Sequence, residues 1–81
     1  MEEKRLAILG IFVRELSNSD AVNALLHEYG GYIVGRLGVP YRERGLSVIS
    51  VIVDAPGDQI SALAGKLGRI PGVQAKAMYT K

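Results

Sequence analysis

Residues 46–54 read LSVISVIVD, and this stretch decides the fold. Valine and isoleucine dominate it, and β-branched residues favour strands. Its apolar side chains fall on both alternating sets: Leu46, Val48 and Ile52 on one, and Ile49, Val51 and Val53 on the other. Because successive side chains of a strand point to opposite faces, this strand has two apolar faces. We therefore expect it at the centre of a sheet.

The segments before this strand predict a hairpin. Residues 41–45, YRERG, are polar and end in glycine, which favours a turn. Residues 32–40, YIVGRLGVP, form the expected partner strand, in which Gly35 and Gly38 indicate a bulge or a close backbone contact. Pro40 suits an edge strand or the end of a strand.

The segments after the strand predict a helix and a last strand. Asp58 follows the break at residues 55–57 and is expected to cap the helix. Apolar residues then recur at helical spacing: Ile60, Leu63, Ala64 and Leu67. We expect the helix to stop at Gly68, and residues 73–80, VQAKAMYT, alternate as a strand does.

The N-terminal half has the same organisation. Residues 4–15, KRLAILGIFVRE, predict a strand with two apolar faces. Ser17 and Asp20 have the spacing of a capping box, so a helix is expected to begin there. The helix has one apolar stripe, formed by Val22, Leu25, Leu26 and Tyr29. The pair at 30–31 is expected to end it, because glycine can take positive φ.

This order of elements predicts an α+β fold, the ferredoxin-like βαββαβ sandwich. We expect a single domain over residues 1–81, with a four-stranded antiparallel sheet in the spatial order 4-1-3-2 and both helices on one face. The other face is then open and apolar, and monomers seldom expose large apolar patches. We therefore expect a homo-oligomer, a dimer or a tetramer, assembled through the sheets. The candidate interface residues are Leu6, Ile8, Phe12, Val48, Ile49, Val51 and Val53.

The composition excludes several kinds of site. The 81 residues include no cysteine, which removes disulfides, thiolate metal sites and iron–sulfur ligation. We expect no metal site and no cofactor. No apolar run reaches the roughly 18 residues that span a bilayer, and the N-terminus lacks the apolar core of a secretory signal. These features predict a cytoplasmic protein without membrane contact.

Basic residues gather around the predicted hairpin. Guanidinium groups bind phosphate or carboxylate in a fork geometry, and the loop before the first helix can receive an anion at the helix N-terminus. The candidate ligand-binding residues are Arg14, Ser17, Asn18, Ser19, Arg36, Tyr41, Arg42 and Arg44. In the alternative interpretation the arginines form a solvated turn balanced by Glu43, and the serines form an ordinary helix cap.

Catalysis and nucleic-acid binding find little support. The chain has one histidine, His27, and no GxSxG element, so we assign no catalytic residue and do not expect an enzyme. The net charge of +2 comes without a basic stripe or a recognition helix, so nucleic acid is not an expected partner.

Two segments resemble a known family. GRLGVPYRERG at 35–45 and GKLGRIPGV at 65–73 are similar to the small proteins named as regulators of the iron-only hydrogenase system. The resemblance covers nearly the whole chain and implies an ACT-like ferredoxin fold, a regulatory or sensing role and an oligomer. The chain is also similar to the C-terminal domain of the nickel-responsive repressor. That domain uses several histidines and a cysteine, so nickel sensing is not carried over.

The sequence leaves competing functions open. The first is a regulatory module that holds a small metabolite at a subunit interface, linked to an iron-only hydrogenase system. The second is a non-catalytic adaptor that docks on a larger partner protein. An enzyme subunit is the third, since ferredoxin-like folds also host catalysis.

Overall fold

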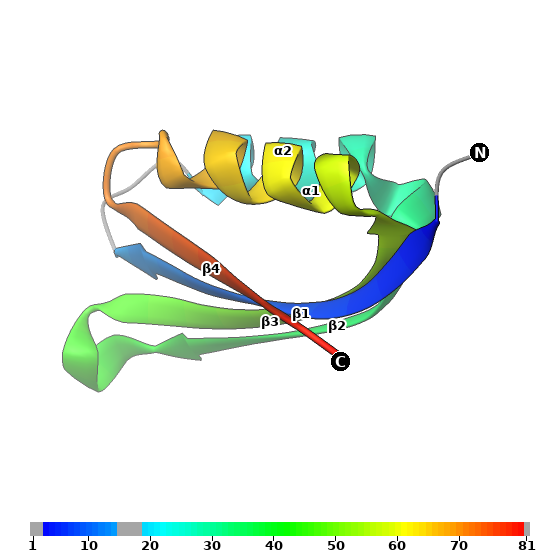
Figure 1. The fold of residues 1–81 in the computed structure, drawn as a ribbon. Coiled ribbons are helices and arrows are strands. Elements are labelled where there is room, and N and C mark those ends of the chain that lie inside the picture. Colours follow the sequence, from blue (N-terminus) through cyan, green and yellow to red (C-terminus); the bar gives the residue numbers. More distant parts are fainter. Residues whose placement is uncertain (1–2, 15–18, 81) are drawn as a thin grey trace.

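The computed structural model describes residues 3–14 and 19–80, which form two layers. A four-stranded antiparallel sheet is one layer, and two helices cover one of its faces (Figure 1). The strands are β1 (Lys4–Arg14), β2 (Ile33–Tyr41), β3 (Leu46–Pro56) and β4 (Val73–Tyr79). The helices are α1 (Ser19–Glu28) and α2 (Gly57–Gly68), and the 3₁₀ turns η1 (Gly30–Tyr32) and η2 (Arg42–Arg44) flank β2.

The spatial order of the strands is β2-β3-β1-β4, which confirms the predicted order and the ferredoxin-like fold. The central strands β1 and β3 pair along their whole length, from Lys4 opposite Pro56 to Arg14 opposite Leu46. The start of β4 lies beside the end of β1, where Val73 pairs with Val13. One end of the sheet therefore gathers the end of β1, the start of β3 and the start of β4.

The core lies between the sheet and the helices. Alternate residues of β1 and β3 point into it, and the apolar stripes of α1 and α2 cover them. The most deeply buried side chains are Leu9, Ile11, Leu26, Ile60, Leu63, Leu67, Val22, Val51 and Val53. Burying each of these side chains contributes roughly 1.5–3 kcal/mol relative to leaving it exposed. This face of the sheet is therefore fixed by burial.

Three of the predicted interface residues belong to this core. Ile49, Val51 and Val53 point toward the helices and are at most 9% exposed. The prediction that they lie on an association surface is wrong, because helices cover their face of the sheet. Leu6 and Val48 are of the opposite set and remain exposed.

The helix ends differ in detail from the sequence predictions. The predicted cap at Ser17 lies outside the described residues. The pair at 30–31 takes no positive φ, which in the described chain occurs only at Gly45 and Gly72. Instead it continues α1 into η1, where the Tyr32 amide donates to the Tyr29 carbonyl at 2.9 Å.

The prediction that Asp58 caps α2 is wrong. Pro56 is the N-cap, and Asp58 lies in the first turn of the helix, where its charge suits the positive end of the helix dipole. The helix ends at Gly68, as predicted. Neither described helix is long and apolar enough to cross a membrane.

The edge strand β2 carries the predicted irregularity. Its register with β3 shifts between Ile33 and Gly35, which confirms a bulge at that glycine. The strand continues to Tyr41, one residue beyond the predicted end. The turn that follows closes through Gly45, whose φ of 67° is left-handed and whose amide donates to the Arg42 carbonyl at 3.0 Å.

Candidate functional site

A hollow of about 400 Å³ lies on the open face of the sheet, at the end that carries the β2–β3 turn. We call it the arginine hollow; its lining residues are Phe12, Arg14, Arg44, Leu46, Gly72, Val73 and Gln74. Its volume is in the range of small-molecule sites. Three strands and two turns build it, so the shape of the hollow depends on the sheet register.

The register places the floor of the hollow. Phe12 lies between Val48 on β3 and Gln74 on β4, because β1 pairs with both strands. Leu46 lies opposite Arg14. The amide of Arg14 donates to the carbonyl of Gly72 at 3.0 Å, which fixes the end of β1 against the turn before β4.

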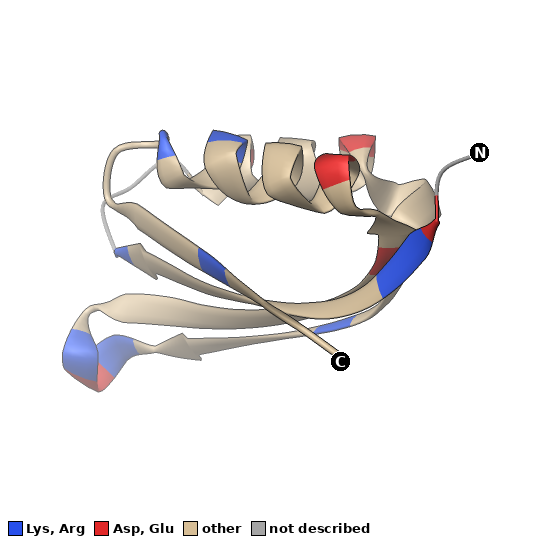
Figure 2. Cartoon of the chain, in the orientation of Figure 1, with Lys and Arg blue, Asp and Glu red and all other residues tan. Residues whose placement is uncertain are grey.

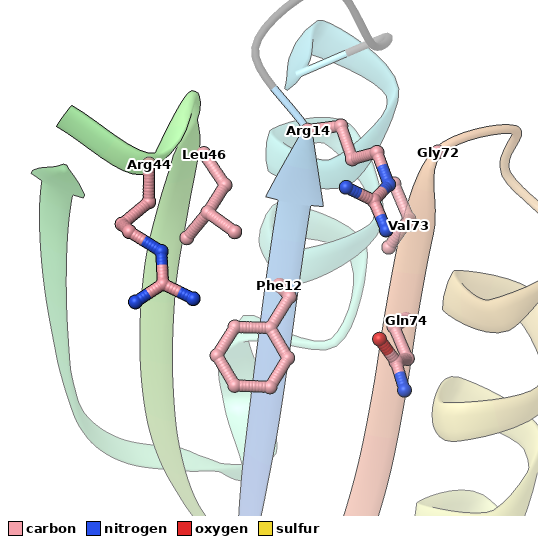
Figure 3. Close-up of a pocket in the computed structure, with 7 residues that line it drawn as sticks. All are labelled: Phe12, Arg14, Arg44, Leu46, Gly72, Val73 and Gln74. Carbon is pink, nitrogen blue, oxygen red and sulfur yellow. The ribbon is translucent and has the colours of Figure 1, made fainter. Parts of the chain in front are cut away.

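Two guanidinium groups flank this floor. Arg14 extends toward Val73 from the last position of β1, and Arg44 extends from η2 on the other side of Leu46 and Phe12 (Figure 3). The side-chain amide of Gln74 lies at the β4 side of the hollow (Figure 3). The arrangement offers positive charge at two places and an apolar surface between them.

The basic side chains at this end form no ion pair with a described carboxylate. Figure 2 shows basic residues at the β2–β3 turn with a single acidic residue among them. Glu43 is that residue, yet the one ion pair between described side chains joins Lys66 to Glu28 at 3.7 Å, on the helices. Within residues 3–14 and 19–80, Arg14 and Arg44 have no ion pair or side-chain hydrogen bond. No described side chain therefore occupies their donors.

A second, smaller hollow of about 160 Å³ adjoins the first and shares Arg14 and Leu46 with it. It brings together four predicted ligand-binding residues: Arg14, Ser19, Tyr41 and Arg42. The sequence candidates on β1, α1 and the hairpin therefore do converge at one end of the fold. Ser17 and Asn18 lie outside the described residues.

Arg36 is used differently from the other arginines. Its Nη2 donates to Oδ1 of Asn23 on α1 at 3.1 Å, which joins the edge strand to the helix layer. It lines a separate hollow with Ser19 and Val22, on the helix side of the sheet. This position argues for a structural role.

Sequence reasoning missed the β4 part of the arginine hollow. Gly72, Val73 and Gln74 carry no distinctive local pattern, and only the strand order puts them beside Phe12. The predicted order 4-1-3-2 contained that information. Phe12, a predicted interface residue, also contributes to the hollow.

The remaining polar groups do not form a second kind of site. Among residues 3–14 and 19–80, no cluster of three histidine or carboxylate side chains could hold a metal ion. The pKa of Lys66 is raised above its ordinary value, chiefly by a hydrogen bond and charge interaction with Tyr29 and then by Glu28. This group lies on the helices, away from the arginine hollow.

The predicted interface residues that remain exposed lie on the open face. Leu6, Ile8, Phe12 and Val48 are each 36–45% exposed. A further apolar hollow of about 300 Å³ lies at the opposite end of this face from the arginines, with Leu6, Ile8, Ile52 and Met78 among its lining residues. Apolar surface therefore extends along most of the face.

The sequence and the fold match known proteins. The model of the TM1266-like family, described as "Iron-only hydrogenase system regulator, putative", matches residues 5–77. The structure of the uncharacterized protein TM1266 from Thermotoga maritima superposes with a TM-score of 0.94 and 40% sequence identity, covering 98% of this chain and 100% of that one.

A more distant likeness concerns the fold alone. A formyltetrahydrofolate deformylase from Pseudomonas putida KT2440 superposes with a TM-score of 0.63 at 22% identity. The match covers 90% of this chain and 28% of the deformylase chain. No curated protein matches the sequence.

Proposed function

We propose that this chain, which belongs to the TM1266-like family described as "Iron-only hydrogenase system regulator, putative", is a regulatory module that pairs with a second copy of itself and binds a small metabolite. It performs no catalysis of its own. The observation that carries the proposal is the open face of the sheet. Its exposed large apolar side chains are Leu6, Ile8, Phe12, Leu37, Val39, Tyr41, Val48, Ile52 and Met78.

Six of these nine side chains stand in two rows across the sheet. In one row Phe12 lies between Val48 and Gln74, and Val39 of β2 lies on the other side of Val48. In the other row Ile8 lies between Ile52 and Met78.

A low row separates the two apolar rows. It is lowest at its centre, where Ser50 and Gly10 are neighbours and Gly10 has open space where a Cβ would stand. Leu37 and Lys76 stand at its two ends. Two ridges with a trough between them form a surface that can interlock with a copy of itself, as a two-fold symmetric interface requires.

The size of the face supports a second copy as its occupant. The molecule measures 43 by 19 Å along its two longest axes, an outline large enough to hold the roughly 800 Å² that each partner contributes to a standard specific interface. A domain of this length buries only a limited share of its surface when it folds. Pairing with a second copy buries more apolar surface and so stabilises the fold.

Charge favours one direction of pairing. Arg14, Arg42 and Arg44 all lie at one end of the sheet. If the two-fold axis ran parallel to the strands, the arginine ends of the two copies would lie over each other, and their like charges would repel. An axis perpendicular to the strands separates the two arginine clusters and places each over the far end of the other copy, where Asp54 is exposed beside Lys4 and Arg5.

The test is the mass of the particle in solution. Light scattering on the purified chain at micromolar concentration should give at least twice the mass of the monomer. Ile8→Asp should weaken this association at least about a hundredfold, because the interface would bury an unpaired charge. The matched control is Ala24→Asp, which adds the same charge at an exposed position on α1 and should leave the mass unchanged.

A monomeric wild-type chain at these concentrations would refute the pairing. The apolar face would then serve a larger partner protein, which is the adaptor function. Association that persists unchanged in Ile8→Asp would equally exclude this face as the contact.

A further inference from the structure

We infer that the arginine hollow binds a small dicarboxylate, with one carboxylate at Arg14, the other at Arg44 and the carbon chain over Phe12. The inference deepens the proposed function and rests on its ligand-binding part, since it names the chemical class of the ligand. It follows from the placement of charge, apolar surface and space in one hollow.

The two arginines determine the number of negative charges. Each guanidinium can donate two parallel hydrogen bonds to a carboxylate, and it is more weakly hydrated than an ammonium group. Among the described residues, neither Arg14 nor Arg44 has an acidic partner. A ligand with one negative charge would satisfy only one of them, whereas a dianion satisfies both.

Their separation determines the shape of the ligand. Arg14 and Arg44 come from different elements and lie on opposite sides of Leu46 and Phe12 (Figure 3). A compact dianion such as phosphate concentrates its charge at one point. A dicarboxylate carries its charges at two ends, which matches two donors with an apolar surface between them.

The floor and the walls fit the middle of such a molecule. Phe12 and Leu46 offer apolar contact to methylene groups, and Phe12 is 45% exposed although it is a large aromatic residue. Gln74 can donate or accept a hydrogen bond at the β4 side. The volume of about 400 Å³ leaves room for substituents on the carbon chain.

The hollow lies on the same face of the sheet through which we propose that two copies pair. Phe12 belongs both to the hollow and to one of the apolar rows of the open face. A second copy on that face would border the hollow and exclude water from it. Exclusion of water strengthens the attraction between guanidinium and carboxylate groups.

The test is calorimetric titration of the full chain with malonate, glutarate and adipate, with butyrate and inorganic phosphate as comparison anions at constant ionic strength. At least one dicarboxylate should bind more tightly than butyrate and phosphate. Arg14→Gln and Arg44→Gln should each weaken its binding about tenfold to a hundredfold, the loss expected for hydrogen bonds between charged groups. Each variant should also lose the preference for dicarboxylate over butyrate.

The control is Arg69→Gln, which removes the same charge at the exposed end of α2 and should bind as the wild type does. Circular dichroism on all variants separates loss of binding from loss of fold. Equal binding of butyrate and every dicarboxylate by the wild type would overturn the inference. Unchanged binding by folded Arg14→Gln or Arg44→Gln, or tighter binding of phosphate than of every dicarboxylate, would do the same.

Light scattering on the same samples separates this inference from the pairing. A monomer that binds a dicarboxylate through both arginines refutes the pairing and supports the hollow as the ligand site. An assembled chain that binds none of the dicarboxylates refutes the ligand and supports the pairing.

Discussion

Val51 and Ile52 are neighbours in β3, yet Val51 is completely buried beneath the helices and Ile52 is 40% exposed on the opposite face of the sheet. Val51→Asp should therefore unfold the chain, whereas Ile52→Asp should leave it folded and affect its association. Val51→Asp places a charge in the core without a partner, which belongs to the class of changes that cost about 4–5 kcal/mol or more. We expect this variant to be unfolded, as measured by circular dichroism and urea titration.

Ile52→Asp is the matched variant on the open face. The charge remains in contact with water in the monomer, so we expect a folded chain with a stability within about 1 kcal/mol of the wild type. Association should be lost, because Ile52 lies in the apolar row with Ile8 and Met78. A folded Val51→Asp variant, or an unfolded Ile52→Asp variant, would contradict the assignment of the two faces.

The trough at Gly10 offers a test that adds no charge. Gly10→Val fills the low row between the two apolar rows, and nothing in the monomer lies within 4 Å of the new Cβ. Valine favours strands more than glycine does, so the isolated chain should gain about 0.5–1 kcal/mol of stability. The association should weaken in light scattering, because the second copy would meet a side chain where the trough was. An unchanged particle mass would show that the trough is not part of the contact.

The β2–β3 turn depends on one glycine conformation. Gly45 has a φ of 67°, which costs a residue with a Cβ roughly 1–2 kcal/mol. Gly45→Ala should destabilise the chain by about this amount in urea titration and should weaken dicarboxylate binding, because Arg44 precedes it in the turn. Gly65→Ala is the control, since it lies inside α2 with open space around it and should add up to about 1 kcal/mol. Equal effects of the two substitutions would contradict this account of the turn.

The strand order could be predicted from the sequence because each piece of it has a local signal. The run at 46–54 is β-branched and apolar, the helical stripes have a regular period, and the right-handed crossover then allows few arrangements. The division of residues between core and open face had no such signal. Val48 and Val51 are chemically alike, and only the helices, which cover one of them, distinguish the two.

The candidate site was predictable where it is built from residues of unusual charge and unpredictable where it is built from ordinary ones. Arg14 and Arg44 stand out in the sequence as cations near a turn. Gln74 does not, and it enters the hollow because β4 pairs with β1 across some sixty residues of chain. The prediction of positive φ at residues 30–31 is wrong, since a turn takes positive φ only where its geometry requires it.

The helix layer gives a prediction about pH. The pKa of Lys66 is raised in the folded chain by Tyr29 first and by Glu28 second. A raised folded pKa means that the interaction stabilises the fold below the unfolded pKa of the lysine and that this contribution is lost as the pH rises through the folded value. The stability of the chain should therefore decline on the alkaline side, beyond the ordinary lysine pKa of 10.5.

Tyr29→Phe isolates the cause of this shift. It keeps the buried ring, over which the Lys66 ammonium lies at 5.2 Å from the centroid, and removes the hydroxyl. NMR titration of the lysine side chain should show a lower Lys66 pKa in Tyr29→Phe than in the wild type. Glu28→Gln should lower the pKa by less, because the carboxylate is the weaker of the two causes and lies 3.7 Å from the ammonium in an exposed pair. A larger effect of Glu28→Gln than of Tyr29→Phe would show that the ion pair, and not the tyrosine, sets the protonation of Lys66.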